Sequence, residues 1–238
     1  MRAKEFLSRK GIDFEAVDVL NDAGGRDRLL KFGVRNVPVV AKGDHFVFGQ
    51  NLEDVAEFVG LQGTGHKPLP PDELIRKWTN VLCAAQRLVR QIPDDKMTER
   101  VIPNRDRAIR LLTHHVFRIG EAFLETATEN VDYAIQHANV PPADGTFTTG
   151  KQVAEYGNNV TRRLEAWWSQ LEDKSGSQKL PTFYGPQPLH QLLERSTWHS
   201  AQHTRQLAAV LERYGIEPDR PLTPEELAGL PLPERLWE

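Results

Sequence analysis

The sequence predicts an α+β chain in two parts, a small α/β unit followed by a four-helix bundle. Three observations support this fold class. The chain has 238 residues, of which 39% are hydrophobic and 26% are charged, as in an ordinary globular protein. Short runs typical of strands occur before residue 60, whereas helical spacing of apolar residues dominates from residue 73 onward. Residues 61–72, rich in glycine and proline, are predicted to link the two parts.

The first part, residues 1–60, is predicted to have the element order α-β-α-β-β-α. Apolar and polar residues alternate over 14–19, as in a half-buried strand. The turn Lys42-Gly43-Asp44 lies between two short apolar runs and predicts a hairpin. Asn51 is a good N-cap for the last helix. The predicted elements are residues 2–10, 14–19, 22–32, 37–40, 45–48 and 51–59.

The second part, residues 73–238, carries long amphipathic stripes. Helices are predicted at about 74–92, from about Asn104 to 123, at about 149–171 and at 188–214. Pro188 suits a first helical turn and Gly215 suits a helix end. Apolar stripes of this length bury one another most simply in a four-helix bundle. The proline-rich tail, 216–238, is expected to pack as an extended segment.

Composition and charge exclude several classes of protein. The net charge is −3 and there is no basic block, which argues against binding nucleic acid. No apolar run is long enough to cross a membrane, so no membrane partner is expected. The N-terminus lacks the apolar core of a signal peptide, and a single cysteine, Cys83, excludes a disulfide scaffold. We therefore expect a cytoplasmic protein.

Segments 1–7, 11–19, 33–40 and 49–54 of the first part are similar, in order, to the glutaredoxin family. The resemblance implies an incomplete thioredoxin/glutaredoxin-like α/β unit. It also implies a cis proline at Pro38, next to the active site of that family, and a glycine turn that holds the carboxylate end of a glutathione-type thiol. The thiol-binding residues that it implies are Val37, Pro38, Gly49, Gln50 and Asn51.

The first strand and the Cys-x-x-Cys motif of that family have no counterpart in residues 1–60. Two interpretations stay open: the motif lies upstream of Met1, or this unit has lost its redox chemistry. A missing central strand also predicts an exposed sheet edge, which a homodimer could fill.

The second part contains the residues with the strongest chemical signal, a set of histidines. Among the 8 histidines of the chain, His199 and His203 are four residues apart on the predicted last helix, so both imidazoles share one face. That face is the apolar stripe, and buried imidazoles need a partner or a metal. His115 shares the apolar face of the second helix and is the candidate third ligand, whereas His114 is expected to face solvent.

The run 197–207, ending at Tyr214-Gly215, resembles the last helix of the DinB/YfiT-like superfamily, and His115-Val116 resembles its first-ligand helix. The resemblance covers about 73–236. It implies a four-helix bundle that holds a divalent metal, commonly zinc or nickel. The implied ligands are His115, His199 and His203.

Three neutral ligands leave a coordination position open, as in catalytic sites. Such a metal can lower the pKa of a bound thiol, which then stays a nucleophile. The superfamily includes S-transferases that use bacillithiol, mycothiol or glutathione, and a thiol-dependent maleylpyruvate isomerase. We therefore predict a metal-dependent enzyme that activates a low-molecular-weight thiol as a metal-bound thiolate. The thiolate would either be transferred to a small electrophile or assist the isomerisation of that electrophile.

No catalytic side chain is predicted for this thiol-dependent enzyme. Two alternative functions remain. The chain could be a non-catalytic metal-binding protein with a degenerate glutaredoxin-like interaction module. A metal hydrolase would instead need a general base, for which Glu121 and Glu194 are the candidates.

Overall fold

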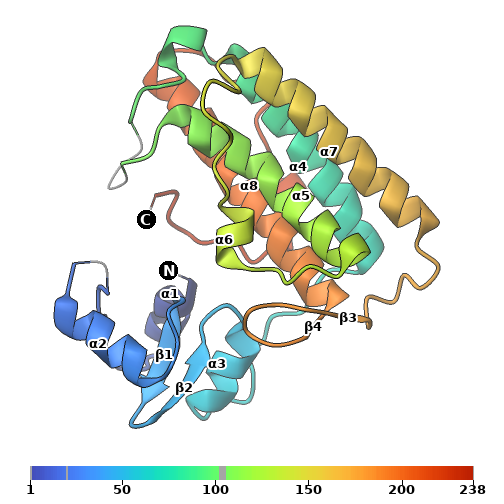
Figure 1. Cartoon of the computed structure of the whole chain (residues 1–238). Helices are drawn as coiled ribbons and strands as arrows, with labels where there is room; N and C mark the ends of the chain where they lie inside the picture. The colour runs from blue at the N-terminus through green and yellow to red at the C-terminus, as the bar shows by residue number, and fades with distance from the viewer. Residues whose placement is uncertain (1, 20, 102–105, 238) are drawn as a thin grey trace. The chain divides into compact units, whose positions relative to one another are not determined.

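The computed structural model describes residues 2–19, 21–101 and 106–237. The chain forms two compact units, Met1–Lys67 and Pro68–Glu238. Each unit has its own hydrophobic core, and long helices are confined to the second (Figure 1). The predicted fold class, a small α/β unit followed by a helical bundle, is confirmed.

The first unit contains short helices and one hairpin. Its elements are α1 (Arg2–Arg9), α2 (Ala23–Lys31), β1 (Val39–Lys42), β2 (His45–Phe48) and α3 (Leu52–Phe58). β1 and β2 pair antiparallel, with Lys42 opposite His45 across the turn. Gly43 has φ +61°, a left-handed conformation that glycine adopts at little cost, which explains the two-residue turn. The side chain of Asn51 accepts a hydrogen bond from the Glu53 amide, as expected of an N-cap.

The strand predicted over residues 14–19 is wrong. This segment has no regular secondary structure, and Phe14 is 40% exposed. A strand needs a hydrogen-bonded neighbour, and within the part of the chain that the structure describes, β1 and β2 pair with each other alone. Alternation of apolar residues is therefore insufficient here, because among the described residues no strand pairs with this segment.

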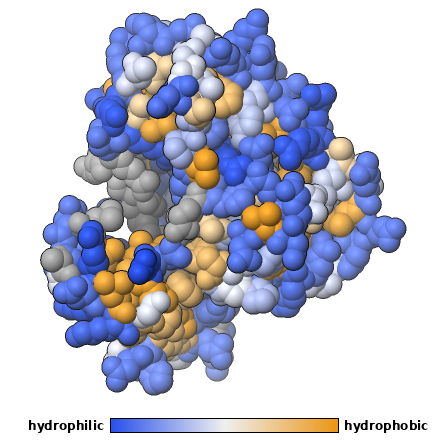
Figure 2. Space-filling model, viewed as in Figure 1, coloured by the Kyte–Doolittle hydropathy of each residue, from blue (hydrophilic) through white to orange (hydrophobic). Residues whose placement is uncertain are grey.

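The first unit buries little and exposes much apolar surface. Its cluster of buried core residues consists of Phe6, Leu7, Val55 and Ala56. Figure 2 shows hydrophobic residues gathered on the face of this unit that carries β1 and β2. The Phe46 ring contacts those of Phe32 and Phe48, with centroids 5.2 and 5.6 Å apart.

The second unit is a four-helix bundle. Its long helices are α4 (Pro71–Gln91), α5 (Ile109–Glu129), α7 (Gly150–Gln170) and α8 (Leu189–Arg213). α4 and α5 each pack mainly against α7 and α8 (Figure 1). The connections contain η1 (Asp94–Lys96), α6 (Ile135–Ala138), β3 (Lys179–Leu180), β4 (Gln187–Pro188) and α9 (Pro224–Leu227). In the described residues, no helix is both long and apolar enough to cross a membrane.

Some predicted boundaries of the bundle differ from those observed. The second helix begins at Ile109 rather than near Asn104, which lies outside the described residues, and residues 106–108 are not helical. The tail is not wholly extended, because a capping box between Thr223 and Glu226 starts the single turn α9. Gly215, with φ +72°, follows the end of α8 as predicted.

Candidate metal centre

Three imidazoles converge between α5 and α8. The ring centroid of His115 lies 5.2 Å from that of His199 and 4.8 Å from that of His203. His199 and His203 are 4.8 Å apart, one helical turn from each other. One ligand nitrogen from each ring lies within 4.8 Å of the others, and His115 and His203 are 3% and 7% exposed. The structure thus brings together the three predicted histidines.

A buried hydrogen-bond relay connects the helices at the level of these histidines. The indole N–H of Trp78 on α4 donates to the Ser200 hydroxyl on α8, at 3.0 Å. That hydroxyl in turn donates to the carbonyl of Val116 on α5, at 3.1 Å. Ser200 and Val116 each follow a cluster histidine in sequence, so the relay holds α5 and α8 in the register that brings the imidazoles together.

The local contacts of His115 fix its tautomer. Its Nδ1 lies 3.0 Å from the carbonyl oxygen of Ala138, which can only accept, so Nδ1 carries the hydrogen and Nε2 has the lone pair. Burial, followed by the neighbouring His203 and His199 imidazoles, holds the pKa of His115 well below its ordinary value. His115 is therefore neutral at pH 7, the form that binds a metal.

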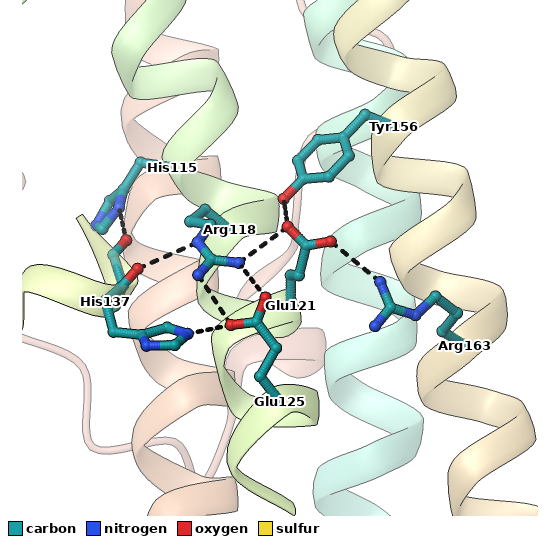
Figure 3. Close-up of polar contacts among 8 residues, drawn as sticks. His115, Arg118, Glu121, Glu125, His137, Tyr156 and Arg163 are labelled. Carbon is teal, nitrogen blue, oxygen red and sulfur yellow. Dashed lines mark hydrogen bonds and ion pairs between the residues drawn. The ribbon is translucent and has the colours of Figure 1, made fainter. Parts of the chain in front are cut away.

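The α6 segment that carries Ala138 is held by a charged network (Figure 3). Arg118, one turn after His115, donates through Nε to the His137 carbonyl at 3.1 Å. Its Nη1 and Nη2 donate to the two carboxylate oxygens of Glu125 at 2.8 and 2.9 Å. The His137 ring also contacts the Glu125 carboxylate. This network holds the segment whose carbonyl orients His115, and so it supports a candidate ligand without itself being placed to bind the metal.

Glu121 belongs to the same network, and its carboxylate is poorly placed to act as the general base of a hydrolase. One carboxylate oxygen accepts from the Tyr156 hydroxyl at 2.6 Å and from Arg118 at 3.0 Å. The other accepts from Arg163 at 3.0 Å. Burial and the hydrogen bond to Glu121 raise the pKa of Tyr156. Both oxygens of this carboxylate are thus engaged in structural contacts, which weakens the hydrolase alternative.

The prediction that His114 faces solvent is wrong. His114 is 7% exposed, and its ring stacks on Tyr156 at 5.3 Å and contacts Phe147 at the same distance. Burial, followed by the charge of Arg118, lowers its pKa to about 4. The periodicity of α5 alone could not show this, because the covering groups come from α7 and from the connection before it.

Cys83, the chain's single cysteine, is half-buried. Burial, followed by the charge of Glu165, raises the pKa of its thiol. A raised pKa lowers the fraction of reactive thiolate. Cys83 is therefore not an activated nucleophile.

The predicted thiol-binding residues also lie together, in the first unit. The Val37–Pro38 peptide bond is cis. The Gly49 amide donates to the Pro38 carbonyl at 2.9 Å, and the Gln50 side chain donates to the Val37 carbonyl at 3.1 Å. A Cβ on Gly49 would lie 3.0 Å from Pro38 Cγ, so glycine suits this close approach and a larger residue would crowd it.

The N-terminus of α3 is already occupied by its own side chains. Asn51 Oδ1 accepts from the Glu53 amide at 3.0 Å, and Asn51 Nδ2 donates to Asp54 at 2.8 Å. Burial raises the pKa of Asp54, and the negative charges of Glu57 and Glu53 add to this effect. The hydrogen bond from Asn51 lowers the pKa but does not outweigh them. Thiol binding at this group stays a prediction.

The donor set of the cluster fits a divalent metal. Imidazole nitrogen suits zinc and nickel, and His115 offers a neutral, buried donor. Nitrogen ligands of a tetrahedral zinc ion lie about 3.3 Å apart, given Zn–N bonds of about 2.0–2.1 Å. The nitrogens of the cluster, within 4.8 Å of one another, approach that spacing. His115, His199 and His203 are therefore the residues that would hold the ion.

Comparisons with known proteins bear on each unit separately. Residues 1–47 match the glutaredoxin family model, which confirms the predicted resemblance of the first part. A DinB-like protein from Bacillus cereus ATCC 10987, solved by crystallography, is 18% identical, with a TM-score of 0.46. The alignment covers 61% of this chain and 93% of that one. The curated proteins gave no match. Of the two predicted resemblances, the family model thus bears on that to glutaredoxin, over residues 1–47.

Proposed function

We propose that the chain is a metal-dependent enzyme that uses a low-molecular-weight thiol. In this proposal His115, His199 and His203 hold a divalent ion, zinc or nickel. The reaction is S-transfer from the thiol to a small electrophile, or thiol-assisted isomerisation of that electrophile. The observation that carries the proposal is the convergence of three imidazole nitrogens within 4.8 Å in a buried part of the bundle. We also propose a cytoplasmic location, where small thiols are kept reduced.

The ligands and their surroundings favour thiol chemistry over hydrolysis. A divalent ion with three neutral ligands keeps its full charge and lowers the pKa of a thiol or water that coordinates to it. The chain's own Cys83 has a raised pKa and is poorly suited to be the nucleophile, which agrees with a small-molecule thiol in that role. Glu121 is engaged by Tyr156, Arg118 and Arg163, which leaves it poorly suited to activate water.

The test of the metal site is the metal content of the purified protein by plasma mass spectrometry. Wild type is expected to hold about one divalent ion per chain, and His115→Ala, His199→Ala and His203→Ala to lose it. His190→Ala is the matched control, because His190 lies on the same helix but is hydrogen-bonded to the Leu69 carbonyl at 2.7 Å. A wild type that stays metal-free after zinc or nickel is added would refute the site.

The test of the reaction uses the loaded protein with glutathione, mycothiol or bacillithiol and monochlorobimane as model electrophile. Thiol consumption is expected with at least one thiol, and it should disappear in the three histidine variants. No turnover with any of the three thiols would refute thiol transfer. Metal that raises the melting temperature without turnover would favour the non-catalytic alternative.

The role of the first unit is a second part of the proposal. We propose that Val37, Pro38, Gly49, Gln50 and Asn51 contact the thiol. Gln50→Ala is expected to weaken thiol binding measured by NMR titration. The substitution removes the side chain that donates to the Val37 carbonyl, next to the other proposed contact residues. Unchanged thiol binding would rule this role out. A homodimer formed through the sheet edge also stays a prediction, and a monomer by light scattering would exclude it.

A further inference from the structure

The C-terminal segment, residues 230–237, is bound along the helix that carries two of the three histidines. Leu230 is buried in the core of the bundle, and Trp237 packs against it. Side chains of α8 donate to main-chain carbonyls of this segment. Gln202 donates to Leu236 at 2.8 Å, and Arg205 donates to Pro233 at 3.2 Å. The segment is thus held both by apolar packing and by directed hydrogen bonds.

Gln206 connects this segment to His203. Its Nε2 donates to the Leu236 carbonyl at 2.8 Å, and its Oε1 lies 2.7 Å from Nδ1 of His203. A carbonyl can only accept, so the amide must point its NH₂ group toward Leu236. Its oxygen must then face His203, which requires the hydrogen of that imidazole to be on Nδ1. The lone pair of the neutral ring is consequently on Nε2.

We propose that Gln206 is a positioning residue for the metal site, and that the C-terminal segment sets its orientation through the Leu236 carbonyl. Gln206 fixes the tautomer and the ring orientation of His203 so that Nε2 serves as the ligand atom. This inference rests on the proposed metal-binding function. It adds that residues 233–236, more than 25 positions after the last ligand, form part of the site's architecture.

The arrangement mirrors the support of His115 on the other side of the cluster. There a main-chain carbonyl, that of Ala138, accepts directly from Nδ1. At His203 the carbonyl of Leu236 acts through one intervening amide. In both cases the hydrogen is on Nδ1 and the lone pair is on Nε2. This is the tautomer that each ring needs in order to bind a metal through Nε2.

Gln202 supplies a matched control within the same helix. It also donates to the C-terminal segment, at Leu236 and at Arg235. Its side-chain oxygen, however, accepts from Arg205 at 2.8 Å rather than from an imidazole. Replacing Gln202 therefore weakens the hold on the segment without removing the acceptor next to His203.

The experiment compares Gln206→Leu, Gln206→Glu and Gln202→Leu, each checked for folding by circular dichroism. In the metal-free protein, ¹⁵N shifts of the His203 ring report which nitrogen carries the hydrogen. Wild type, Gln206→Glu and Gln202→Leu are expected to keep it on Nδ1, because an acceptor remains there. Gln206→Leu is expected to lose this preference. Zinc affinity, measured with a competing chelator, should fall about 10–100-fold in Gln206→Leu, in the range known for lost ligand-supporting groups.

Two results would overturn the inference. One is a His203 tautomer and zinc affinity that do not change in Gln206→Leu. The other is an equal loss in Gln202→Leu, because Gln206 and its contacts with Leu236 and His203 remain in that variant and the effect would then not pass through Gln206. Failure of the metal site itself is distinguishable, since wild type would then bind no zinc while the ring shifts of His203 still responded to Gln206→Leu.

Discussion

Arg118→Met is the substitution whose effect the structure predicts most sharply. The Arg118 side chain is 10% exposed and pairs with Glu121 and Glu125, whose side chains are 24% and 22% exposed. It also donates to the His137 carbonyl. Methionine keeps much of the volume but removes every donor, so two carboxylates one turn apart would remain without their shared cation.

The cost follows from the burial of the three groups. Removing one partner of a fully buried ion pair costs about 3–5 kcal/mol. Glu121 and Glu125 keep some contact with water, so we expect a smaller loss, about 2–4 kcal/mol. For a unit of this size each kcal/mol lowers Tm by about 2–4 °C, so Tm should fall by about 5–15 °C.

The assay is urea unfolding followed by tryptophan fluorescence. All 5 tryptophans lie in the second unit, so the signal reports the bundle rather than the glutaredoxin-like unit. Arg163→Met is the control, because Arg163 is 42% exposed and pairs with Glu121 at the surface. It should cost less than about 1 kcal/mol. Arg118→Met costing no more than Arg163→Met would refute the reasoning.

The pH dependence gives a second check on the same substitution. Burial raises the pKa of Glu125, but Arg118 and His137 outweigh it and hold the pKa below its ordinary value. A carboxyl with a lowered folded-state pKa contributes stability above its unfolded value, lost as pH falls through the folded value. The difference between wild type and Arg118→Met should therefore be largest near pH 7 and shrink below about pH 4.5. A difference that is constant with pH would contradict the ion-pair explanation.

Two further predictions concern the packing and capping of α7. A Cβ at Gly157 would lie 2.4 Å from Cε1 of the fully buried Phe117 ring, so Gly157→Val should cost about 1–3 kcal/mol by overpacking. Asn158→Val, at the next and exposed position, is the control, and equal losses in urea unfolding would argue against a clash. Thr149→Ala removes one half of the capping box with Gln152 and should lower stability by about 1 kcal/mol. An unchanged Tm after Thr149→Ala would mean that the cap contributes nothing.

The proximity of the three candidate ligands could be predicted largely because they lie on helices. Spacing within α8 places His199 and His203 on one face, and the apolar stripe of α5 selects His115. The same reasoning failed for His114, whose cover comes from Tyr156 and Phe147 on other segments. Helical periodicity shows which face points inward, but not how far neighbouring segments extend over the remaining faces.

The groups that support the ligands were not predicted. Charges of opposite sign at Arg118, Glu121 and Glu125 follow helical spacing, and this pattern could have indicated an ion-pair network. No local pattern could have identified the contact between Gln206 and Leu236, because it joins residues 30 positions apart through a main-chain carbonyl. Contacts to the backbone of an irregular segment leave no trace in side-chain spacing.

The hydroxyl of Ser200 joins three helices at one depth of the bundle. Because it accepts from Trp78 and donates to the Val116 carbonyl, the separation of α5 and α8 is set next to the histidines. The relay is formed by Trp78, Ser200 and Val116, within the helices rather than in the connections between them. Insertions or deletions in the connections can therefore change the ends of the bundle while the spacing of the histidines is preserved. Among relatives, we therefore expect loop lengths to diverge much faster than the small hydroxyl residue at position 200.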